Sequence, residues 1–207
     1  MSSSVRSMES GRLGQPSLAL KHMASNPASR CSPMQEESHP TGQSNPRPES
    51  GTLPWTRSCF VCGQDNPHGL RLRSRVEGDR VALDYTTREA DLGYRHLVHG
   101  GITMTLLDEV MTWAAIIASQ RACVAAELTV RLRKPIVVGQ RLRVEGWVTA
   151  AKGRLLTAEG VVCHETRQVL ASASGKHMPM SPDQFRLCAK DFVISPDSIH
   201  PDRLMPP

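Results

Sequence analysis

An antiparallel sheet of about five to six strands, wrapped around one long central helix, is the α+β fold that this sequence predicts. Residues 102–119 form one long block that is apolar on nearly every side, as expected for a helix buried all round. Alternation of apolar and polar residues, typical of strands, precedes this block twice and follows it about four times. Because no helical segment separates the later strands, parallel βαβ units are not expected.

Two strands are expected before the helix, at residues 69–75 and 80–85, where apolar and charged side chains alternate. Glu77-Gly78-Asp79 between them has the composition of a hairpin turn. A loop from about residue 87 to 98 then leads into the helix.

After the helix, residues 126–133 place Leu128, Val130 and Leu132 on one face of a strand and polar side chains on the other. The same period continues in three later segments, which are residues 141–149, 155–163 and 169–177. These four segments, together with the two strands before the helix, make up the expected sheet.

The composition divides the 207 residues into three parts. Residues 1–55 are rich in Ser and Pro and lack apolar material for a core, so we expect a disordered leader. Residues 56–180 carry the alternating pattern and form the expected domain, which is long enough for one core. Residues 181–207, with five prolines, form a C-terminal tail.

Charge and hydropathy exclude several classes of protein. The formal net charge of +5 is modest, and without a nucleic-acid motif it does not indicate DNA or RNA binding. No apolar run of about 18 residues lacks charge, so no membrane span is expected. The chain has no secretory signal, which favours the cytoplasm. A Ser-rich leader with more basic than acidic residues leaves mitochondrial import as the alternative.

Polar residues on the predicted helix fall on one stripe. Thr105, Asp108, Glu109 and Thr112 are spaced three, four and seven residues apart. Two adjacent carboxylates on an otherwise apolar helix are costly unless the stripe meets solvent, a partner or a ligand. A solvent-facing stripe is the simpler interpretation of this feature alone.

The start of the helix favours a functional interpretation. His99-Gly100-Gly101 brings a backbone without Cβ atoms to the positive end of a buried helix. Free N–H groups there can approach a carbonyl oxygen and stabilise the oxyanion of acyl transfer. A tight loop-to-helix turn explains the two glycines by themselves, but the glycines together with the acidic stripe are a more specific signal.

These residues resemble a known family. HGGITMTLLDE, beginning at His99, is similar to the signature of PaaI-like hotdog-fold acyl-CoA thioesterases. The resemblance extends to CFVCGQDNPHGLRL at residues 59–72 and to AELTVRLRKPIVVGQRLRVEG at residues 126–146. It implies a hotdog fold, hydrolysis of an acyl-CoA thioester to acid and CoA, a homodimer or tetramer, and no metal or redox cofactor.

The resemblance also implies roles for single residues. The Gly100 amide would polarise the thioester carbonyl, and Asp108 would act from across a dimer interface, either as nucleophile or as base for water. His99 would shape the loop and contact the thioester, and Thr112 would orient the water. Gly101 belongs to the same bare backbone.

One position departs from the family pattern. Several relatives carry Asn or Gln six residues before the histidine, where this chain has Gly93. Tyr94, His96 or a second backbone amide would then have to replace that polar group, or the oxyanion hole would be weaker. We therefore include Gly93 and Tyr94 among the candidate substrate-binding residues.

Other polar residues give weaker signals. Arg154 and Lys176 are candidates for the phosphates of CoA, among basic residues that are mostly expected on solvated faces. Cys59 and Cys62 form a CxxC pair, and without a second pair a zinc site is not expected. Buried free thiols are the default, and a redox-sensitive disulfide is the alternative.

Two other functions remain possible. An enoyl-CoA hydratase of this fold would present a His soon after the acid, whereas the next histidine after Asp108 is His164. A non-catalytic acyl-CoA-binding or regulatory protein is the second alternative, which Gly93 in place of a polar residue keeps open.

Overall fold

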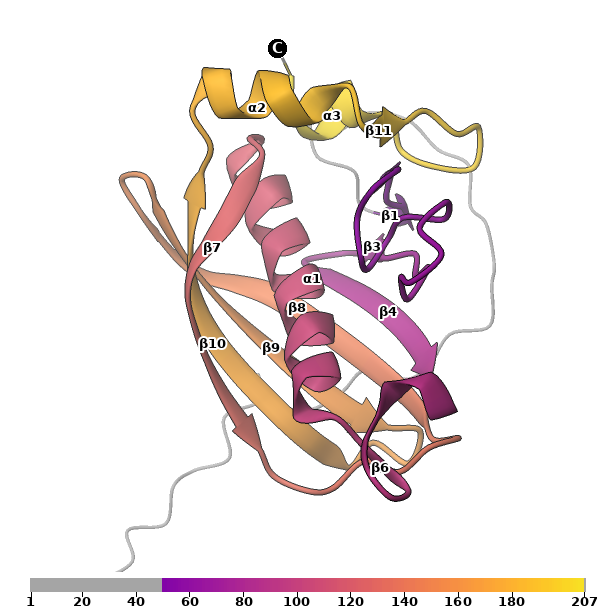
Figure 1. The fold of residues 1–207 in the computed structure, drawn as a ribbon. Coiled ribbons are helices and arrows are strands. Elements are labelled where there is room, and N and C mark those ends of the chain that lie inside the picture. The colour runs from indigo at the N-terminus through magenta and orange to yellow at the C-terminus, as the bar shows by residue number, and fades with distance from the viewer. Residues whose placement is uncertain (1–49, 207) are drawn as a thin grey trace, which may run out of the picture.

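The computed structural model describes residues 50–206, which form a seven-stranded antiparallel sheet curved around α1 (Gly100–Ser119) (Figure 1). The strands follow the order β1-β3-β4-β8-β9-β10-β7 across the sheet. Their bounds are Ser50–Thr52 (β1), Arg75–Glu77 (β3), Arg80–Thr86 (β4), Cys123–Leu132 (β7), Arg141–Lys152 (β8), Leu155–His164 (β9) and Val169–Pro179 (β10). The strand that follows the helix, β7, thus lies at one edge of the sheet.

The predicted hotdog-type architecture is confirmed, with two differences in detail. The seventh strand is β1, which pairs with β3 although its residues fall in the range expected for the leader. Residues 1–49 of that leader lie outside the described part of the chain. The strand expected at residues 69–75 is wrong except for its last residue, because the N–H groups of Leu70 and Leu72 donate to Phe60 and Val61 carbonyls at 2.8 Å.

The helix packs directly on the middle of the sheet through two glycines. Gly146 of β8 and Gly160 of β9 are paired residues on the face that α1 covers. A Cβ at Gly146 would lie 2.7 Å from the Val110 carbonyl carbon, and one at Gly160 would lie 3.1 Å from the Met111 Sδ. The backbone of α1 can therefore approach these strands only because both positions lack a side chain.

The helix is buried on most of its surface, as its composition predicted. Leu106, Leu107, Val110 and Met111 are at most 1% exposed and lie in the main core. Its length and hydropathy would allow a membrane span, but its contacts with four long strands identify it as the core helix of this domain. Asp108 and its neighbours on the polar stripe remain partly exposed.

The segment expected as a C-terminal tail folds back onto the domain. It contains α2 (Pro182–Ala189), β11 (Phe192–Val193) and α3 (Pro201–Leu204), which lie beyond the end of α1 (Figure 1). Strand β11 pairs with β2 (Trp55–Thr56), and the Phe192 ring meets Trp113 of α1 edge-on at 6.4 Å. The two ends of the described chain therefore cover one end of the core together.

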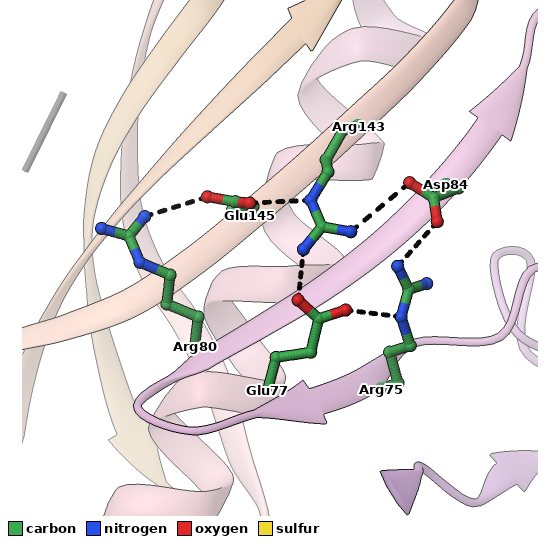
Figure 2. A network of polar contacts seen from close by, with 6 residues as sticks. All are labelled: Arg75, Glu77, Arg80, Asp84, Arg143 and Glu145. Atoms are coloured by element: carbon green, nitrogen blue, oxygen red, sulfur yellow. Dashed lines mark hydrogen bonds and ion pairs between the residues drawn. The ribbon is translucent and has the colours of Figure 1, made fainter. Parts of the chain in front are cut away.

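A network of ion pairs links β3, β4 and β8 on the face of the sheet away from α1 (Figure 2). Its centre is Arg143, which is 1% exposed and pairs with Glu77, Asp84 and Glu145. Arg80 donates to Glu145 at 3.0 Å, and Arg75 bridges Glu77 and Asp84 at 2.6 Å each. The three arginines balance three carboxylates, which allows Arg143 and Glu145 to be buried as charges.

The contact at Gly146 gives a first prediction. Replacing Gly146 with Ala should lower the free energy of unfolding by about 1–3 kcal/mol, because the new methyl group would press on the backbone of α1. Thermal unfolding followed by circular dichroism measures the loss. The control is Ala150→Val, which adds more volume at an exposed position of the same strand and should change the melting temperature little. Equal stability of Gly146→Ala and the parent would show that the helix does not lie this close.

Candidate functional site

The loop that leads into α1 is held by a buried carboxylate. It contains the 3-10 helix η2 (Glu89–Asp91), β5 (Leu92–Tyr94) and β6 (Leu97–Val98). Asp91, which is 1% exposed, accepts hydrogen bonds from the Tyr85 hydroxyl and from Arg88. Burial raises the pKa of Tyr85, and the bond to Asp91 raises it further, so this hydroxyl stays a donor. The Asp91 carbonyl in turn accepts the His99 N–H at 2.7 Å and fixes the start of the helix.

His99 caps the N-terminus of α1. Its Nδ1 accepts the Gly101 N–H at 2.9 Å, so the Gly101 amide is used inside the protein. Gly101 stays a candidate substrate-binding residue, but its N–H is taken by this cap. No hydrogen bond between described residues takes the Gly100 N–H, which lies in the first turn and is partly exposed. Gly100 therefore offers the free donor that the sequence predicted.

A cavity of about 240 Å³ adjoins this donor. Its walls are Val98, Gly100, Thr103, Leu132, Arg133, Lys134, Pro135 and Ile136. A Cβ at Gly100 would lie 2.9 Å from the Leu132 side chain, so glycine keeps this opening wide. The cavity combines a free amide, an apolar wall and two cations.

Gly93 packs against the capping histidine. A Cβ there would lie 2.9 Å from the His99 Cα and 3.1 Å from its Cδ2. In this loop the position that carries Asn or Gln in several relatives has no room for a side chain. The neighbouring Tyr94 is 83% exposed, so neither residue forms a second polar wall in the described chain.

Asp108 lies on the same helix as Gly100, more than two turns further along. Eight residues at about 1.5 Å each separate the two by roughly 12 Å along the axis. The Asp108 carboxylate accepts a hydrogen bond from the Thr112 hydroxyl at 3.4 Å, which is the partner that the sequence suggested. Burial raises the pKa of Asp108, while nearby His177 and the Thr112 bond lower it. One thioester carbonyl cannot meet both groups within a single chain.

His177 is a residue of this site that sequence reasoning missed. It is 0% exposed on β10, and both ring nitrogens lack a hydrogen-bond partner in the described structure. Burial lowers the pKa of His177, and the Asp108 carboxylate acts against that shift. The alternation of residues 169–177 could have revealed it, since a histidine on the helix-facing side of a strand is unusual.

Glu109 points into a different environment from Asp108. Its carboxylate accepts the Trp113 Nε1–H at 2.9 Å, on the side of α1 that faces the N-terminal turn. Burial raises the pKa of Glu109 to about 8, and the nearby Cys59 sulfur also raises it. The two adjacent acids, which the sequence placed on one stripe, therefore lie in different surroundings.

Arg154 and Lys176 lie away from the cavity at Gly100. Lys176 pairs with Glu127 on the neighbouring strand at 2.5 Å, and Arg154 donates to the Pro179 carbonyl at 3.4 Å. The basic residues at the cavity are instead Arg133 and Lys134. Both residues follow directly on β7. From the sequence, basic residues such as these were mostly expected on solvated faces.

The cysteines follow the expected pattern in part. Cys59, Cys62, Cys123 and Cys188 are free thiols, whereas Cys163 is disulfide-bonded. No group of three potential metal ligands occurs within residues 50–206.

The sheet around a single helix, with a free amide at the helix start, defines the class of hotdog-fold proteins. Residues 96–171 match the model of the thioesterase superfamily. The match confirms the resemblance to hotdog thioesterases that the motif at His99 indicated.

The chain is also similar to several solved structures. A thioesterase superfamily protein is 25% identical, with 59% of this chain and 60% of that chain covered and a TM-score of 0.54. The PaaI protein of the Escherichia coli phenylacetic acid degradation operon is 18% identical, with 51% and 75% covered and a TM-score of 0.48. An acyl-CoA hydrolase of Staphylococcus aureus is 18% identical, with 51% and 65% covered and a TM-score of 0.48.

The chain spans 60% of the length of the first of these relatives. No curated protein matches the chain.

The packing of Gly93 on His99 gives a second prediction. Gly93→Asn, which introduces the residue that several relatives carry, should destabilise this protein by about 1–3 kcal/mol, because the new Cβ would displace the helix cap. Chemical denaturation measures the change. Tyr94→Asn is the matched control, since Tyr94 is almost fully exposed and its loss should leave the unfolding midpoint near that of the parent. A stable Gly93→Asn variant would contradict the tight contact.

Proposed function

We propose that this protein hydrolyses an acyl-CoA thioester to a free acid and CoA. The observation that carries the proposal is the free Gly100 amide at the N-terminus of α1, with the partly buried Asp108 two turns further along. A preorganised N–H at a helix start stabilises a developing oxyanion. A carboxylate held in a half-buried position supplies the base or nucleophile.

The active site is proposed to form between two copies of the chain. Gly100 and Asp108 are roughly 12 Å apart along one helix, so the acid that serves a given Gly100 must come from a partner. The edge strand β7 is suited to this contact, because Val124 and Leu132 on it are 45% and 50% exposed. Sedimentation showing only a monomer that retains full activity would contradict this arrangement.

In the proposed reaction the thioester carbonyl oxygen accepts the Gly100 N–H. Asp108 either removes a proton from water, which then attacks the carbonyl carbon, or attacks the carbon itself to form an anhydride that water cleaves. The Thr112 hydroxyl would orient the water, and its hydrogen bond to Asp108 supports that role. Collapse of the tetrahedral intermediate releases CoA as the thiolate. The proposed reaction uses no metal or redox cofactor.

Arg133 and Lys134 are the proposed contacts for the phosphates of CoA. They line the cavity that contains Gly100, whereas Lys176 is already paired with a carboxylate. Cations beside the oxyanion donor would bind the phosphates electrostatically.

The third prediction tests the choice of carboxylate. Asp108→Asn should lower hydrolysis by at least about 10²–10⁴-fold, because the near-isosteric amide can neither accept a proton nor form an anhydride. Release of free thiol from a panel of short, long and aromatic acyl-CoAs measures the loss. Glu109→Gln is the control and should cost far less, since that side chain bonds to Trp113. A larger loss in Glu109→Gln would mean that the wrong acid was chosen.

The fourth prediction concerns pH. If ionised Asp108 is required, activity falls as pH decreases through its pKa, which burial places above the ordinary value of about 3.9. His177 lowers that pKa, so His177→Leu should move the acidic limb of the kcat/KM profile to higher pH. The fold should survive, because the ring has no hydrogen bonds to lose. An unmoved or lowered limb would show that His177 does not act on Asp108.

The buried imidazole beside Asp108 also favours a second function, hydration of an enoyl-CoA by an Asp and His pair. In the sequence no histidine follows Asp108 closely, which argued against a hydratase, whereas in the fold His177 lies near enough to lower the pKa of Asp108. Loss of the enoyl absorbance without thiol release would identify a hydratase. Binding of acyl-CoA without either reaction would identify a non-catalytic binding protein.

A further inference from the structure

The CxxC pair lies in the turn that follows β2. The Cys59 Sγ accepts the backbone N–H groups of Val61 and Cys62, both at 3.3 Å. Cys59 is partly exposed, whereas Cys62 is only 5% exposed. The turn thus presents one sulfur to solvent on a platform of N–H donors and shields the other behind it.

The geometry of this turn is fixed by its backbone. The Cys59 carbonyl accepts the Gly63 N–H at 3.1 Å, and a Cβ at Gly63 would lie 2.4 Å from that oxygen. On the other side, the Asp191 carboxylate accepts the Ser58 N–H at 3.1 Å, and its carbonyl accepts the Arg57 N–H at 2.9 Å. The segment after α2 therefore holds the turn in place.

The two thiols are chemically unequal. Hydrogen bonding from Cys62 lowers the pKa of Cys59 to about 5, and the backbone amides act in the same direction against burial. The same interaction and burial raise the pKa of Cys62. An exposed thiolate beside a shielded thiol is the arrangement by which dithiols exchange with disulfides.

A cavity opens at the exposed sulfur. It has a volume of about 580 Å³ and is lined by Thr56, Ser58, Cys59, Leu187, Cys188, Lys190 and Asp191. Its size admits a peptide-like thiol compound, and Lys190 offers a cation to a carboxylate on such a molecule.

A carboxylate of the core helix lies near the pair. Glu109 raises the pKa of Cys62, and Cys59 in turn raises the pKa of Glu109. This coupling disappears once Cys59 carries no charge. Burial still raises the pKa of Glu109, to about 8, so near and above that pH its carboxylate is ionised and can accept the Cys62 proton.

We propose that Cys59 and Cys62 form a redox-active dithiol that reduces the disulfide of a low-molecular-weight thiol. The Cys59 thiolate attacks one sulfur of the bound disulfide, which forms a mixed disulfide and releases one thiolate. Cys62 passes its proton to Glu109 and attacks the Cys59 sulfur, which closes the Cys59–Cys62 disulfide and releases the second thiolate. Two electrons move from the dithiol to the small disulfide, and this activity is independent of the proposed hydrolysis.

The experiment uses the full reduced chain carrying Cys188→Ser, which removes the other cysteine of the cavity. It is incubated with glutathione disulfide, and the products are followed by intact mass and peptide mapping. The parent should form a Cys59–Cys62 link with loss of two hydrogens, which peptide mapping distinguishes from the disulfide of Cys163. With Cys62→Ser or Cys62→Ala, a glutathione adduct should accumulate at Cys59, and with Cys59→Ser neither product should form.

The reactivity of Cys59 gives a second readout. At pH 6 it should react with iodoacetamide about 10-fold faster than a single cysteine in an unfolded peptide, because the larger thiolate fraction outweighs its lower nucleophilicity. Equal rates would overturn the proposal, as would an adduct at Cys62 when Cys59 is replaced. Tightly bound zinc that protects both thiols would also overturn it.

Glu109→Gln tests the proposed proton transfer from Cys62 while leaving both cysteines in place. The first step, adduct formation at Cys59, should proceed, whereas closure by Cys62 should slow by about 10²-fold, the lower end of general-base effects. The adduct would then be seen transiently even with both cysteines present. An unchanged ratio of the two rates would overturn the role of Glu109.

Discussion

The close contact between α1 and the centre of the sheet determines where the functional groups of the helix lie. Gly146 and Gly160 allow the backbone of the helix to rest on β8 and β9, and Val110 and Met111 fill the space directly above them. A helix seated at this depth has no freedom to rotate, because its neighbours on either side are buried in the main core. This fixed position of the helix determines the directions in which the side chains of Asp108 and Glu109 point.

Adjacent acids consequently meet opposite surroundings. Asp108 is influenced by the unpaired His177 of β10 and bonds to Thr112 on its own helix, and both lower the pKa of its carboxyl against burial. Glu109 turns towards the N-terminal turn and bonds to Trp113, which itself contacts the C-terminal segment. From the sequence, two adjacent carboxylates on an apolar helix indicate only a cost in free energy. In the structure they belong to two separate sites on one rigid helix.

The sequence predicted the parts of the fold that depend on local pattern. The period of the four later strands, the apolar helix and the turn at Gly78 all follow from side chains that are neighbours in the chain. The strand predicted at residues 69–75 is wrong, because the N–H groups of this segment bond to the Phe60 and Val61 carbonyls rather than to a neighbouring strand of the sheet. The folded C-terminal segment was also missed, since its few apolar residues gain their burial from distant partners.

The candidate site, like the fold, was predictable only where its residues are close together in the chain. His99, Gly100, Asp108 and Thr112 lie within fourteen residues, so helix geometry alone relates them. His177 and the cavity residues Arg133 and Lys134 reach the site through the pairing and curvature of the sheet, which no local pattern encodes. The same holds for Cys59, whose surroundings depend on α1 and on the segment after α2.

The terminal segments have a structural consequence for the proposed dithiol. Strands β2 and β11 pair with each other, and Asp191 holds the backbone before Cys59. A superfamily core that ended at β10 would leave this turn, Trp113 and Glu109 uncovered. In this chain segments outside the matched residues 96–171 pack there, since Phe192 meets the Trp113 ring and Lys190 lines the cavity at Cys59. The proposed dithiol therefore depends on segments outside the matched residues, whereas the proposed hydrolytic residues Gly100, Asp108 and Thr112 lie within them.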